Sequence, residues 1–318
     1  YILSLNIEGS IMTSEIGCVL VTYNRIEKLK KTLECYSTQT VPPKYILVVN
    51  NCSTDGTGEY LCQWEKISEG FKKLVIHTAE NLGGSGGFYL GEERALHLDA
   101  DWVMIADDDA YPEPNYLEGM QKYIDHHDFS KISIVCGKVA EHNHFDNIHR
   151  TVFRSKWDRN FHEAAPAGCY QKPEFNPDFV SYVGIVINKS KLEQVGLVNK
   201  EYFIWCDDTE HTYRLGTVGK IVCIPAYSII HDVDISNDEL SWKSYYGYRN
   251  DLMFFKQHFK MHFPAIVMKL FFKTLLCPLK GRSVAEMKLR LYAIKDAISG
   301  NMGKNIIYKP GWQPSSVK

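Results

Sequence analysis

Three consecutive aspartates, Asp107, Asp108 and Asp109, follow a short apolar run at residues 102–106. Alternate carboxylates at the end of a strand can point to the same side and bind a hard divalent cation, Mg²⁺ or Mn²⁺, which keeps positions open for substrate phosphates. An exposed acidic turn that caps the next helix is the alternative interpretation. Metal-assisted phosphate chemistry is therefore one of two hypotheses for this segment.

A glycine-rich segment at residues 81–88 (NLGGSGGF) precedes a predicted helix. Because glycines carry no side chain, backbone N–H groups can approach a ligand at the N-terminus of that helix; a flexible turn is the simpler interpretation. The segment lacks the Gly-Lys-Ser/Thr ending of a P-loop, and it does not follow the first strand as a dinucleotide fingerprint does. Both of those nucleotide-binding motifs are therefore excluded.

A second acidic cluster, with the sequence WCDDTE, begins at Trp205. The helix dipole stabilises acids in a first helical turn, but it does not account for the tryptophan. An aromatic ring beside a carboxylate suits a sugar, because the ring covers C–H groups while the carboxylate takes a hydroxyl proton as a general base. The isolated His231 ends another predicted strand; it is a structural histidine unless it reaches the same metal as the aspartates.

The elements that must position these residues alternate between strands and helices. Strands are predicted at residues 19–23, 46–49, 74–77 and 102–106, and helices at residues 25–38, 58–67 and 88–98. The strands lack clean alternation, as strands buried on both faces of a parallel sheet do. This pattern predicts an α/β fold with a doubly wound, mostly parallel central sheet flanked by helices. Ligands bind such sheets beyond the carboxyl ends of the strands, so residues 22–25, 50–57 and 107–109 should converge.

The second half of the chain is less regular. Residues 142–177 are rich in His, Asn, Pro and aromatic residues and predict a long loop. The remaining predicted elements are strands at 182–188, 220–224 and 227–231, helices at 189–195 and after residue 206, and a helical, aromatic region from Tyr245 onward.

Composition limits the class of protein. The chain has 318 residues, 45% of them hydrophobic and 23% charged, which is ordinary for a soluble globular protein. Nine scattered cysteines, with no CxxC pair, favour single thiols in a reducing cytosol over a disulfide framework or a zinc ribbon. Residues 1–11 precede the first methionine, and we interpret them as an added leader outside the fold.

Positive charge is concentrated near the C-terminus. Residues 243–295 hold eleven Lys or Arg and two Asp or Glu, although the formal net charge of the whole chain is −2. Within this region the apolar stretch 262–279 is interrupted by Lys269 and Lys273, so it is a poor membrane span. It predicts a helix that lies on an anionic membrane surface, or one that packs on the catalytic body or in a dimer. No nucleic-acid recognition motif accompanies the charge.

The order of these segments closely resembles family 2 glycosyltransferases with the GT-A fold, most of all bacterial galactofuranosyltransferases. The resemblance covers roughly residues 17–232, and rhamnosyltransferases of the same family look similar. It rests on six segments: VLVTYNR (19–25), VVNNCSTDGT (48–57), NLGGSGGF (81–88), DDD (107–109), residues 182–210 and IIHD (229–232).

The resemblance implies a role for each matching residue. Asp208 is the implied catalytic base, with Asp207 as its competitor, and Asn50 falls where the family usually has an Asp that reads uracil. The implied ligands of Mn²⁺ or Mg²⁺ are Asp107, Asp109 and His231. The implied nucleotide and donor contacts are Thr22, Tyr23, Arg25, Asn50, Asp55, Asn81, Gly83, Gly84 and Asp108. The expected acceptor contacts are Trp205, His211, Tyr245 and Arg249.

The leading hypothesis is an inverting, metal-dependent transferase that moves galactofuranose from UDP-galactofuranose to a saccharide or polyprenyl-linked acceptor. It would act in the cytoplasm or at the inner face of the cell membrane, in the synthesis of a surface polysaccharide such as O antigen or capsule; a homo-oligomer stays open. The expected parts are a GT-A domain at 12–240, with a nucleotide half at 12–115 and an acceptor half at 116–240, and a helical basic region at 241–318.

Three alternatives remain beside this hypothesis. A rhamnosyltransferase or another hexosyltransferase would keep the chemistry and change the donor. A sugar-nucleotide pyrophosphorylase would carry a glycine-rich loop with Arg and Lys after the first strand, where this chain has residues 22–25 (TYNR). A non-catalytic carbohydrate-binding protein would not need Asp107, Asp109, Asp208 and His231 together.

Overall fold

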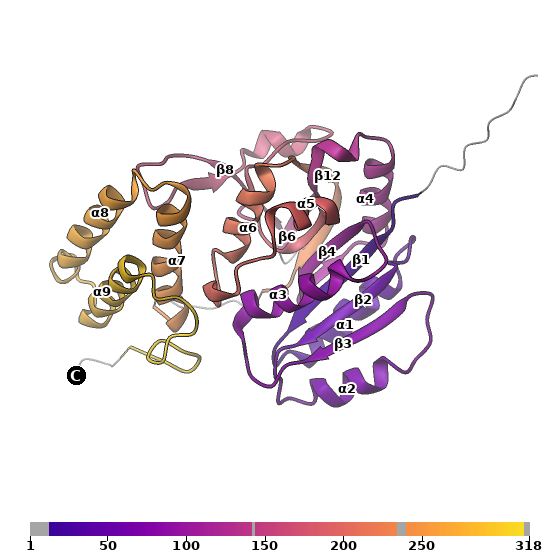
Figure 1. Ribbon diagram of the computed structural model, residues 1–318, viewed down its shortest axis with the longest axis horizontal. Coiled ribbons are helices and arrows are strands. Elements are labelled where there is room, and N and C mark those ends of the chain that lie inside the picture. Colours follow the sequence, from indigo (N-terminus) through magenta and orange to yellow (C-terminus); the bar gives the residue numbers. More distant parts are fainter. Residues whose placement is uncertain (1–12, 142–143, 234–239, 315–318) are drawn as a thin grey trace, which may run out of the picture.

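The computed structural model describes residues 13–141, 144–233 and 240–314. The interpretation of residues 1–11 as an added leader concerns residues outside these ranges. The described chain forms an α/β body, followed by helices that stand beside it (Figure 1).

The first half of the sheet is parallel, as the sequence predicts. The strand order is β3-β2-β1-β4, and every neighbouring pair among these four strands runs parallel. The strands are β1 Ile16–Thr22, β2 Tyr45–Asn50, β3 Lys72–His77 and β4 Trp102–Asp107, and the connecting helices are α1 Ile26–Ser37, α2 Thr57–Trp64 and α3 Gly83–Leu96. All residues of β1 and β2 are buried, which explains why their sequences do not alternate.

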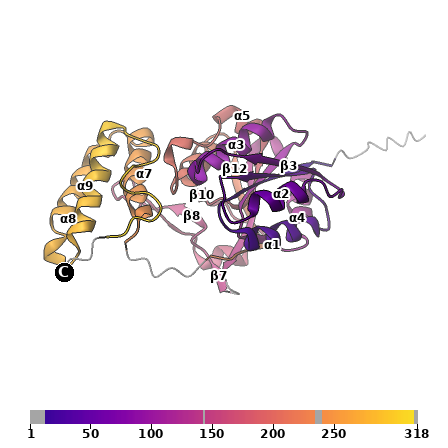
Figure 2. The ribbon, with the colours of Figure 1, turned by 90° about the horizontal axis from the view of Figure 1, so that it is seen from below.

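Helices cover both faces of this sheet. Figure 2 shows α3 and α5 on one side and α1, α2 and α4 on the other, and each side has its own apolar core. Leu33 and Leu61 pack in the core beneath α1 and α2, whereas Phe88 and Leu192 pack in the core beneath α3 and α5. The remaining helices of the body are α4 Tyr116–Asp125, α5 Lys189–Val195 and α6 Asp207–Gly216, with short 3₁₀ turns at Phe129–Lys131, Ala167–Gln171 and Lys200–Tyr202.

The second half of the sheet mixes directions. Strand β11 (Val183–Asn188) runs antiparallel to both β4 and β6 (Ile132–Glu141). Strand β12 (Lys220–His231) runs parallel to β6 and antiparallel to β5 (Ala110–Pro112). The two strands predicted at 220–224 and 227–231 are thus one strand, with a register shift between Ile224 and Ser228 at the proline. Proline lacks an N–H and is tolerated at such a bulge.

The prediction of a long loop at residues 142–177 is wrong for the residues that the structure describes there. They contain β7 (His144–Asp146), which pairs with β6, and β8 (Arg150–Phe153) and β9 (His162–Ala164), which form a small antiparallel sheet with β10 (Phe179–Val180). The buried Arg150 guanidinium fastens this sheet to the body, because it donates to the carbonyls of Gly137 (3.0 Å) and Val183 (2.9 Å).

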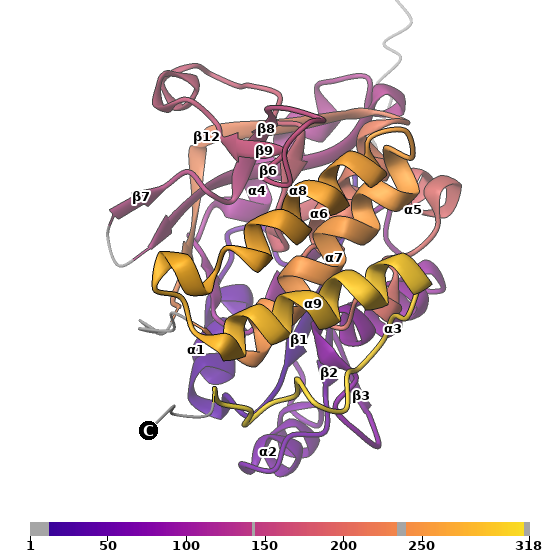
Figure 3. The ribbon, with the colours of Figure 1, turned by 90° about the vertical axis from the view of Figure 1, so that its left-hand side faces the viewer.

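Three helices follow the body, as the sequence predicts. They are α7 (Trp242–His258), α8 (Phe263–Leu275) and α9 (Val284–Ser299), with a 3₁₀ turn at Pro278–Lys280. In Figure 3 α8 and α9 face the viewer, outside α7. Phe254 of α7 stacks on Phe161 at 4.4 Å between ring centroids, so α7 shares an apolar core with the small sheet. Within the described ranges no helix is both long and apolar enough to cross a bilayer. A domain division at residue 240 stays a prediction.

Candidate active site

The loops after β1 and β2 are joined by hydrogen bonds at the carboxyl edge of the sheet. The backbone N–H of Thr54 donates to the Asn24 side chain at 2.7 Å, and the N–H of Asn24 donates to the Ser53 hydroxyl at 3.0 Å. Asp55 accepts from the N–H of Ile26 at 3.0 Å, at the start of α1. These two loops therefore converge as predicted, and Asp55 helps to join them because its carboxylate accepts the backbone N–H of Ile26.

Asp108 connects the aspartate triplet to the loop after β1. Its carboxylate accepts from the Thr22 hydroxyl at 2.7 Å and from the Arg25 guanidinium at 3.1 Å, and Arg25 also pairs with Asp109 at 2.6 Å. Burial raises the pKa of Asp108 to about 6, although the charge of Arg25 opposes the shift. Thr22, Arg25 and Asp108 form one polar unit, whereas Tyr23 is exposed beside it.

Asp107, Asp109 and His231 lie together, as a shared cation requires. Their candidate ligand atoms all lie within 4.8 Å of one another, and Nε2 of His231 is 3.3 Å from Oδ1 of Asp109. That buried oxygen accepts no hydrogen bond from the residues that the structure describes. Two carboxylates and an imidazole with an unsatisfied oxygen fit Mn²⁺ or Mg²⁺.

The pKa values of the two aspartates in this trio shift in opposite directions. Burial, followed by the charge of Asp109, raises the pKa of Asp107 to about 8. Burial also acts to raise the pKa of Asp109, but the close contact with the His231 ring and the charge of Arg25 outweigh burial, and the pKa is lowered. The two carboxylates therefore differ in proton affinity because only Asp109 has cationic neighbours in direct contact.

Sequence reasoning missed two residues behind His231. Nε2 of His149 lies 3.3 Å from Nδ1 of His231, and the Ser181 hydroxyl lies 2.7 Å from the other ring nitrogen of His149. Glu141 completes a second group of potential ligand atoms with these two histidines. Only the pairing of β6 with β12 brings Glu141 to this place, so no local sequence pattern reveals it.

The glycine-rich segment is helical rather than a loop. Gly83 to Gly87 form the first turns of α3, and the N–H of Ser85 donates to the carbonyl of Phe203 at 3.2 Å. Gly83 has φ +75°, and a Cβ atom built there would lie 2.1 Å from the same carbonyl. Asn81 accepts from the N–H of Gly83 at 2.8 Å. Gly83 is required because the backbone of Phe203 approaches it closely, whereas a Cβ atom at Gly84 would meet no heavy atom within 4 Å.

Asn51, a further residue that sequence reasoning missed, stabilises this turn. Its buried amide donates to the carbonyl of Gly83 at 2.8 Å and accepts from the N–H of Leu82 at 2.9 Å. The neighbouring Asn50 is also buried, with its amide bonded to the N–H of Ser53 (3.1 Å) and to His77 (3.1 Å). The Asn50 amide is thus used inside the protein, which does not match a contact with a nucleotide base.

The turn before α6 carries Trp205 in an unusual backbone conformation. Phe203, Trp205 and Cys206 all have φ between 62° and 67°, a region that non-glycine residues seldom occupy. The Asn250 amide donates to the carbonyls of Ile204 (2.9 Å) and Trp205 (2.8 Å), which stabilises the turn. The Trp205 ring is 46% exposed, so it is free to stack on a sugar.

Asp207 and Asp208 begin α6 directly after this turn. Asp207 is buried, and burial followed by the charge of Asp208 raises its pKa to about 7. Asp208 is partly exposed and accepts from the N–H of Thr209 at 2.6 Å; burial raises its pKa as well. The hydrogen bonds from Thr209 oppose that shift most, followed by His162, which the sequence did not single out. Asp208 is therefore the more accessible candidate base.

Three predicted acceptor contacts lie in the interior instead. His211 is fully buried and contacts the Tyr182 hydroxyl and the carbonyl of Gly196. Tyr245 is 1% exposed, and its hydroxyl donates to Asp296. Arg249 is also 1% exposed and donates to the carbonyls of Tyr202 (2.9 Å) and Gly303 (2.6 Å). In this structure the protein itself satisfies the polar atoms of these three residues, so their acceptor contacts stay predictions that the geometry does not support.

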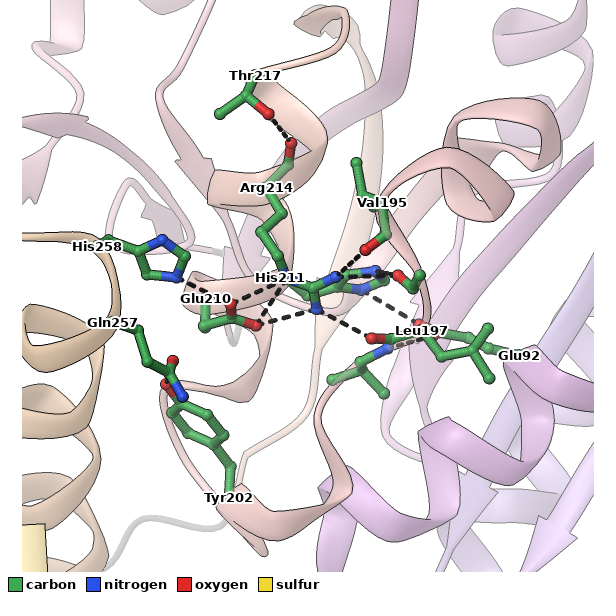
Figure 4. A network of polar contacts seen from close by, with 12 residues as sticks. Glu92, Val195, Leu197, Tyr202, Glu210, His211, Arg214, Thr217, Gln257 and His258 are labelled. Atoms are coloured by element: carbon green, nitrogen blue, oxygen red, sulfur yellow. Dashed lines mark hydrogen bonds and ion pairs between the residues drawn. The ribbon is translucent and has the colours of Figure 1, made fainter. Parts of the chain in front are cut away.

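A polar network anchors α6 to its neighbours (Figure 4). Glu210 pairs with Arg214 and His258, both at 2.9 Å, and thereby links α6 to α7. Arg214 donates to the carbonyls of Val195 (2.7 Å) and Leu197 (2.9 Å). The helix that begins with Asp207 and Asp208 is thus fixed on two sides.

Comparison with known proteins defines the class to which this fold and site belong. The family described as Glycosyl transferase family 2 matches residues 18–182, about half of the chain. The chain belongs to this family. The match includes the aspartate triplet and the glycine-rich start of α3.

Individual relatives give a finer picture. Galactofuranosyltransferase GlfT1 of Mycobacterium tuberculosis (strain ATCC 25618 / H37Rv) is 29% identical over 64% of this chain. The chain spans only 65% of the length of that relative. The dTDP-rhamnosyl transferase RfbF of Shigella flexneri is 23% identical over 92% of this chain and 98% of its own length.

Solved structures agree on the fold, and the GT-A fold is confirmed. GalNAc-T7, determined with UDP, GalNAc and Mn²⁺, matches with a TM-score of 0.63 at 14% identity over 91% of this chain and 56% of its own. Residues 1–349 of S. aureus TarS, in complex with UDP-GlcNAc, match with a TM-score of 0.59 at 14% identity over 90% of this chain and 81% of theirs.

Proposed function

We propose that this protein is a metal-dependent, inverting glycosyltransferase, and that it moves galactofuranose from UDP-galactofuranose to a hydroxyl of a saccharide or lipid-linked acceptor. The observation that carries the proposal is the convergence of Asp107, Asp109 and His231 from β4 and β12, with candidate ligand atoms within 4.8 Å of one another. A bound Mn²⁺ or Mg²⁺ would supply positive charge against the nucleoside diphosphate.

The residues of the chain divide the remaining work. Arg25 and Thr22 fix Asp108 at the donor side of the site. Trp205 presents its exposed ring to a sugar, and the Asp208 carboxylate takes the proton of the acceptor hydroxyl. The acceptor oxygen forms its bond to the anomeric carbon from the face opposite the diphosphate, and the bond from that carbon to the diphosphate oxygen breaks. One such displacement inverts the anomeric configuration without a covalent intermediate.

Two kinds of relative favour different donor sugars. GlfT1 favours UDP-galactofuranose through its higher identity. RfbF favours dTDP-rhamnose, since it matches over nearly its whole length. We keep dTDP-rhamnose as the second candidate donor, with the same roles for Asp107, Asp109, His231 and Asp208.

The basic C-terminal region supports a place beside an anionic surface. Residues 243–295 carry nine more cationic than anionic side chains, and α8 exposes several apolar ones. We propose peripheral binding at the inner face of the cell membrane, in surface polysaccharide synthesis. Phosphatidylcholine vesicles with and without anionic lipid test this part separately from catalysis.

The donor assay uses UDP-galactofuranose, dTDP-rhamnose and UDP-galactose with Mn²⁺ or EDTA and a synthetic galactoside acceptor. We expect EDTA-sensitive release of UDP from UDP-galactofuranose, with a matching gain in acceptor mass. Turnover of dTDP-rhamnose instead would keep the mechanism and replace the donor. If no donor binds in calorimetry and none is turned over, the proposal is wrong.

A further inference from the structure

A strongly basic pocket lies outside the site described above. It has a volume of about 260 Å³ and is enclosed by α7, α8, α9 and the turn at residues 158–160. Five of its ten lining residues are cationic: Arg159, Lys269, Lys273, Arg282 and Arg290. Neither the metal trio nor the acidic turn before α6 contributes to it.

Acidic residues do not neutralise this pocket. Asp158 is the only carboxylate among the lining residues. Arg159 pairs with Asp251, and Arg282 (2.6 Å) and Arg290 share the single carboxylate of Glu286. Five cations thus face three carboxylates, which leaves two positive charges in excess.

Two of the cations offer unused hydrogen-bonding capacity. The Lys273 ammonium has no partner among the residues that the structure describes. Arg290 is only 7% exposed, and its buried Nε–H likewise has no described acceptor. A buried donor without an acceptor costs about 1–3 kcal/mol, so a bound anion would relieve a cost that the fold otherwise carries.

An aromatic ring holds the guanidinium groups in place. Arg159 and Arg290 each lie 4.7 Å from the centroid of Tyr248. Such stacking orients guanidinium groups while their N–H donors stay available for a phosphate. The pocket is therefore organised before any ligand arrives.

An apolar surface adjoins the pocket on α8. Ile266 and Leu270 pack inward, whereas the opposite side of the helix exposes its large apolar residues. The exposed fractions are 51% for Met268, 55% for Phe272, 46% for Leu275 and 44% for Leu276. Lys269 and Lys273 belong to the same helix, so a ligand with a charged head and an apolar chain matches both features.

Residues next to the pocket also contact the turn before α6 that holds Trp205 and Cys206. Asp251, which pairs with Arg159, accepts a hydrogen bond from the Cys206 thiol at 2.9 Å, and Cys206 directly precedes Asp207. Tyr248 follows Gly247, whose Cα approaches the Trp205 ring so closely that an added Cβ would lie 3.0 Å from it. The pocket and the proposed base therefore lie on neighbouring sides of α7.

We infer that this pocket binds the phosphate or diphosphate head of an amphiphile whose apolar chain lies along the exposed side of α8. Binding itself follows from the pocket alone. The role of that amphiphile as the acceptor, presented to Asp208 across α7, rests on the proposed function. Arg282 and Lys273 are the residues expected to contact the phosphate oxygens, since they are exposed and line the opening.

The test is calorimetry of the full chain in EDTA with three probes: farnesyl diphosphate, inorganic pyrophosphate and farnesol. EDTA removes the divalent cation that a diphosphate needs at the donor site. We expect farnesyl diphosphate to bind at least tenfold more tightly than pyrophosphate and farnesol not to bind measurably. Lys273→Gln and Arg282→Gln should each weaken farnesyl diphosphate about tenfold, or ~1.4 kcal/mol.

Matched controls locate the effect. Lys288→Gln removes an exposed cation of α9 that does not line the pocket, and it should leave affinity unchanged. Asp109→Asn should also leave it unchanged, which separates this site from the donor site. Phosphatidylcholine vesicles that contain either phosphatidic acid or phosphatidylserine distinguish binding of a phosphate monoester from binding to general negative charge. We expect the protein to prefer phosphatidic acid, and we expect Lys273→Gln to abolish this preference.

Several results would overturn the inference. Equal affinity for pyrophosphate and farnesyl diphosphate would show that the apolar chain does not contribute to binding. Undiminished binding of farnesyl diphosphate in both pocket variants would show that it binds elsewhere. Equal binding to all anionic vesicles, unaffected by Lys273→Gln, would show a diffuse charged surface. Each readout is independent of turnover, so a failure here leaves the donor assay untouched.

Discussion

Nε2 of His231 lies 3.3 Å from Oδ1 of Asp109, which joins the end of β12 to the loop that follows β4. Strand β5 makes this contact possible, because it carries the chain from Asp109 back along β12 in antiparallel register. The pair places an imidazole beside the aspartates without any nearby sequence signal. It is the geometric basis for the proposed metal site.

Asp109→Asn is expected to weaken Mn²⁺ binding at least tenfold. The variant replaces one of the two carboxylates among the three proposed ligands with a neutral amide. Calorimetric titration with Mn²⁺ measures this directly. Asp99→Asn is the control, since the Asp99 side chain is 90% exposed and remote from the trio. Equal Mn²⁺ affinity in Asp109→Asn and wild type would exclude Asp109 as a ligand.

Trp205→Ala is expected to raise the KM for the acceptor about tenfold, equivalent to ~1.4 kcal/mol, and to leave donor affinity unchanged. The reason is that the ring is exposed beside the proposed base. Steady-state kinetics with varied acceptor provide the measurement. Trp157→Ala removes another exposed tryptophan, near the start of α8, and serves as the comparison. An unchanged acceptor KM would contradict a sugar contact.

Asp207→Asn is expected to stabilise the fold at pH 8 and not at pH 4. Burial, then the charge of Asp208, raises the pKa of Asp207 from the ordinary 3.8 to about 7. Between these values the folded chain keeps a proton that the unfolded chain has lost, so the free energy of unfolding falls as the pH rises. A rise of about 3 in pKa corresponds to about 4 kcal/mol above pH 7, and the asparagine variant does not lose this stability.

Urea unfolding of wild type and Asp207→Asn at pH 4, 6 and 8 tests this dependence. Asp99→Asn again provides an exposed reference. A stability difference that stayed constant across the three pH values would show that the Asp207 carboxyl titrates normally.

Gly83→Ala is expected to lower the free energy of unfolding by about 2 kcal/mol or more, since a non-glycine residue at positive φ is strained and its Cβ would lie 2.1 Å from the carbonyl of Phe203. Gly84→Ala is a matched control, because no heavy atom lies within 4 Å of the Cβ it would add. Thermal melts of both variants compare them. Equal melting temperatures would mean that residue 83 has room to move.

Much of the fold was predictable because buried strands and the helices that cover them have recognisable apolar sequence patterns. The apolar strands β1, β2 and β4 and their helices follow from local pattern, and the aspartates at the end of β4 follow from the rule that such edges bind ligands. The small sheet around β8 was not predictable, because its strands are only two to four residues long and depend on the buried Arg150. Strand β12 was divided in the prediction at a proline that the structure accommodates in a bulge.

The candidate site was predictable where chemistry resides in adjacent residues, and less so where it depends on distant contacts. Adjacent residues alone singled out the aspartates, whereas the family resemblance added His231 to Asp107 and Asp109, and the geometry brings the three together. Arg249 looked like a surface contact, yet its guanidinium is satisfied by the carbonyls of Tyr202 and Gly303, which are far away in the chain. The support that Asn51 gives the first turn of α3 was invisible for the same reason.

The most direct test of the account compares wild type with Asp208→Asn in Mn²⁺-dependent release of UDP from UDP-galactofuranose with a galactoside acceptor. Donor affinity is measured in parallel by calorimetry. The account predicts that turnover falls by about 10²–10⁴-fold, because the general base is lost, while donor affinity changes less than twofold. Full turnover in Asp208→Asn, with donor affinity intact, would contradict the central claim that Asp208 accepts the proton of the acceptor.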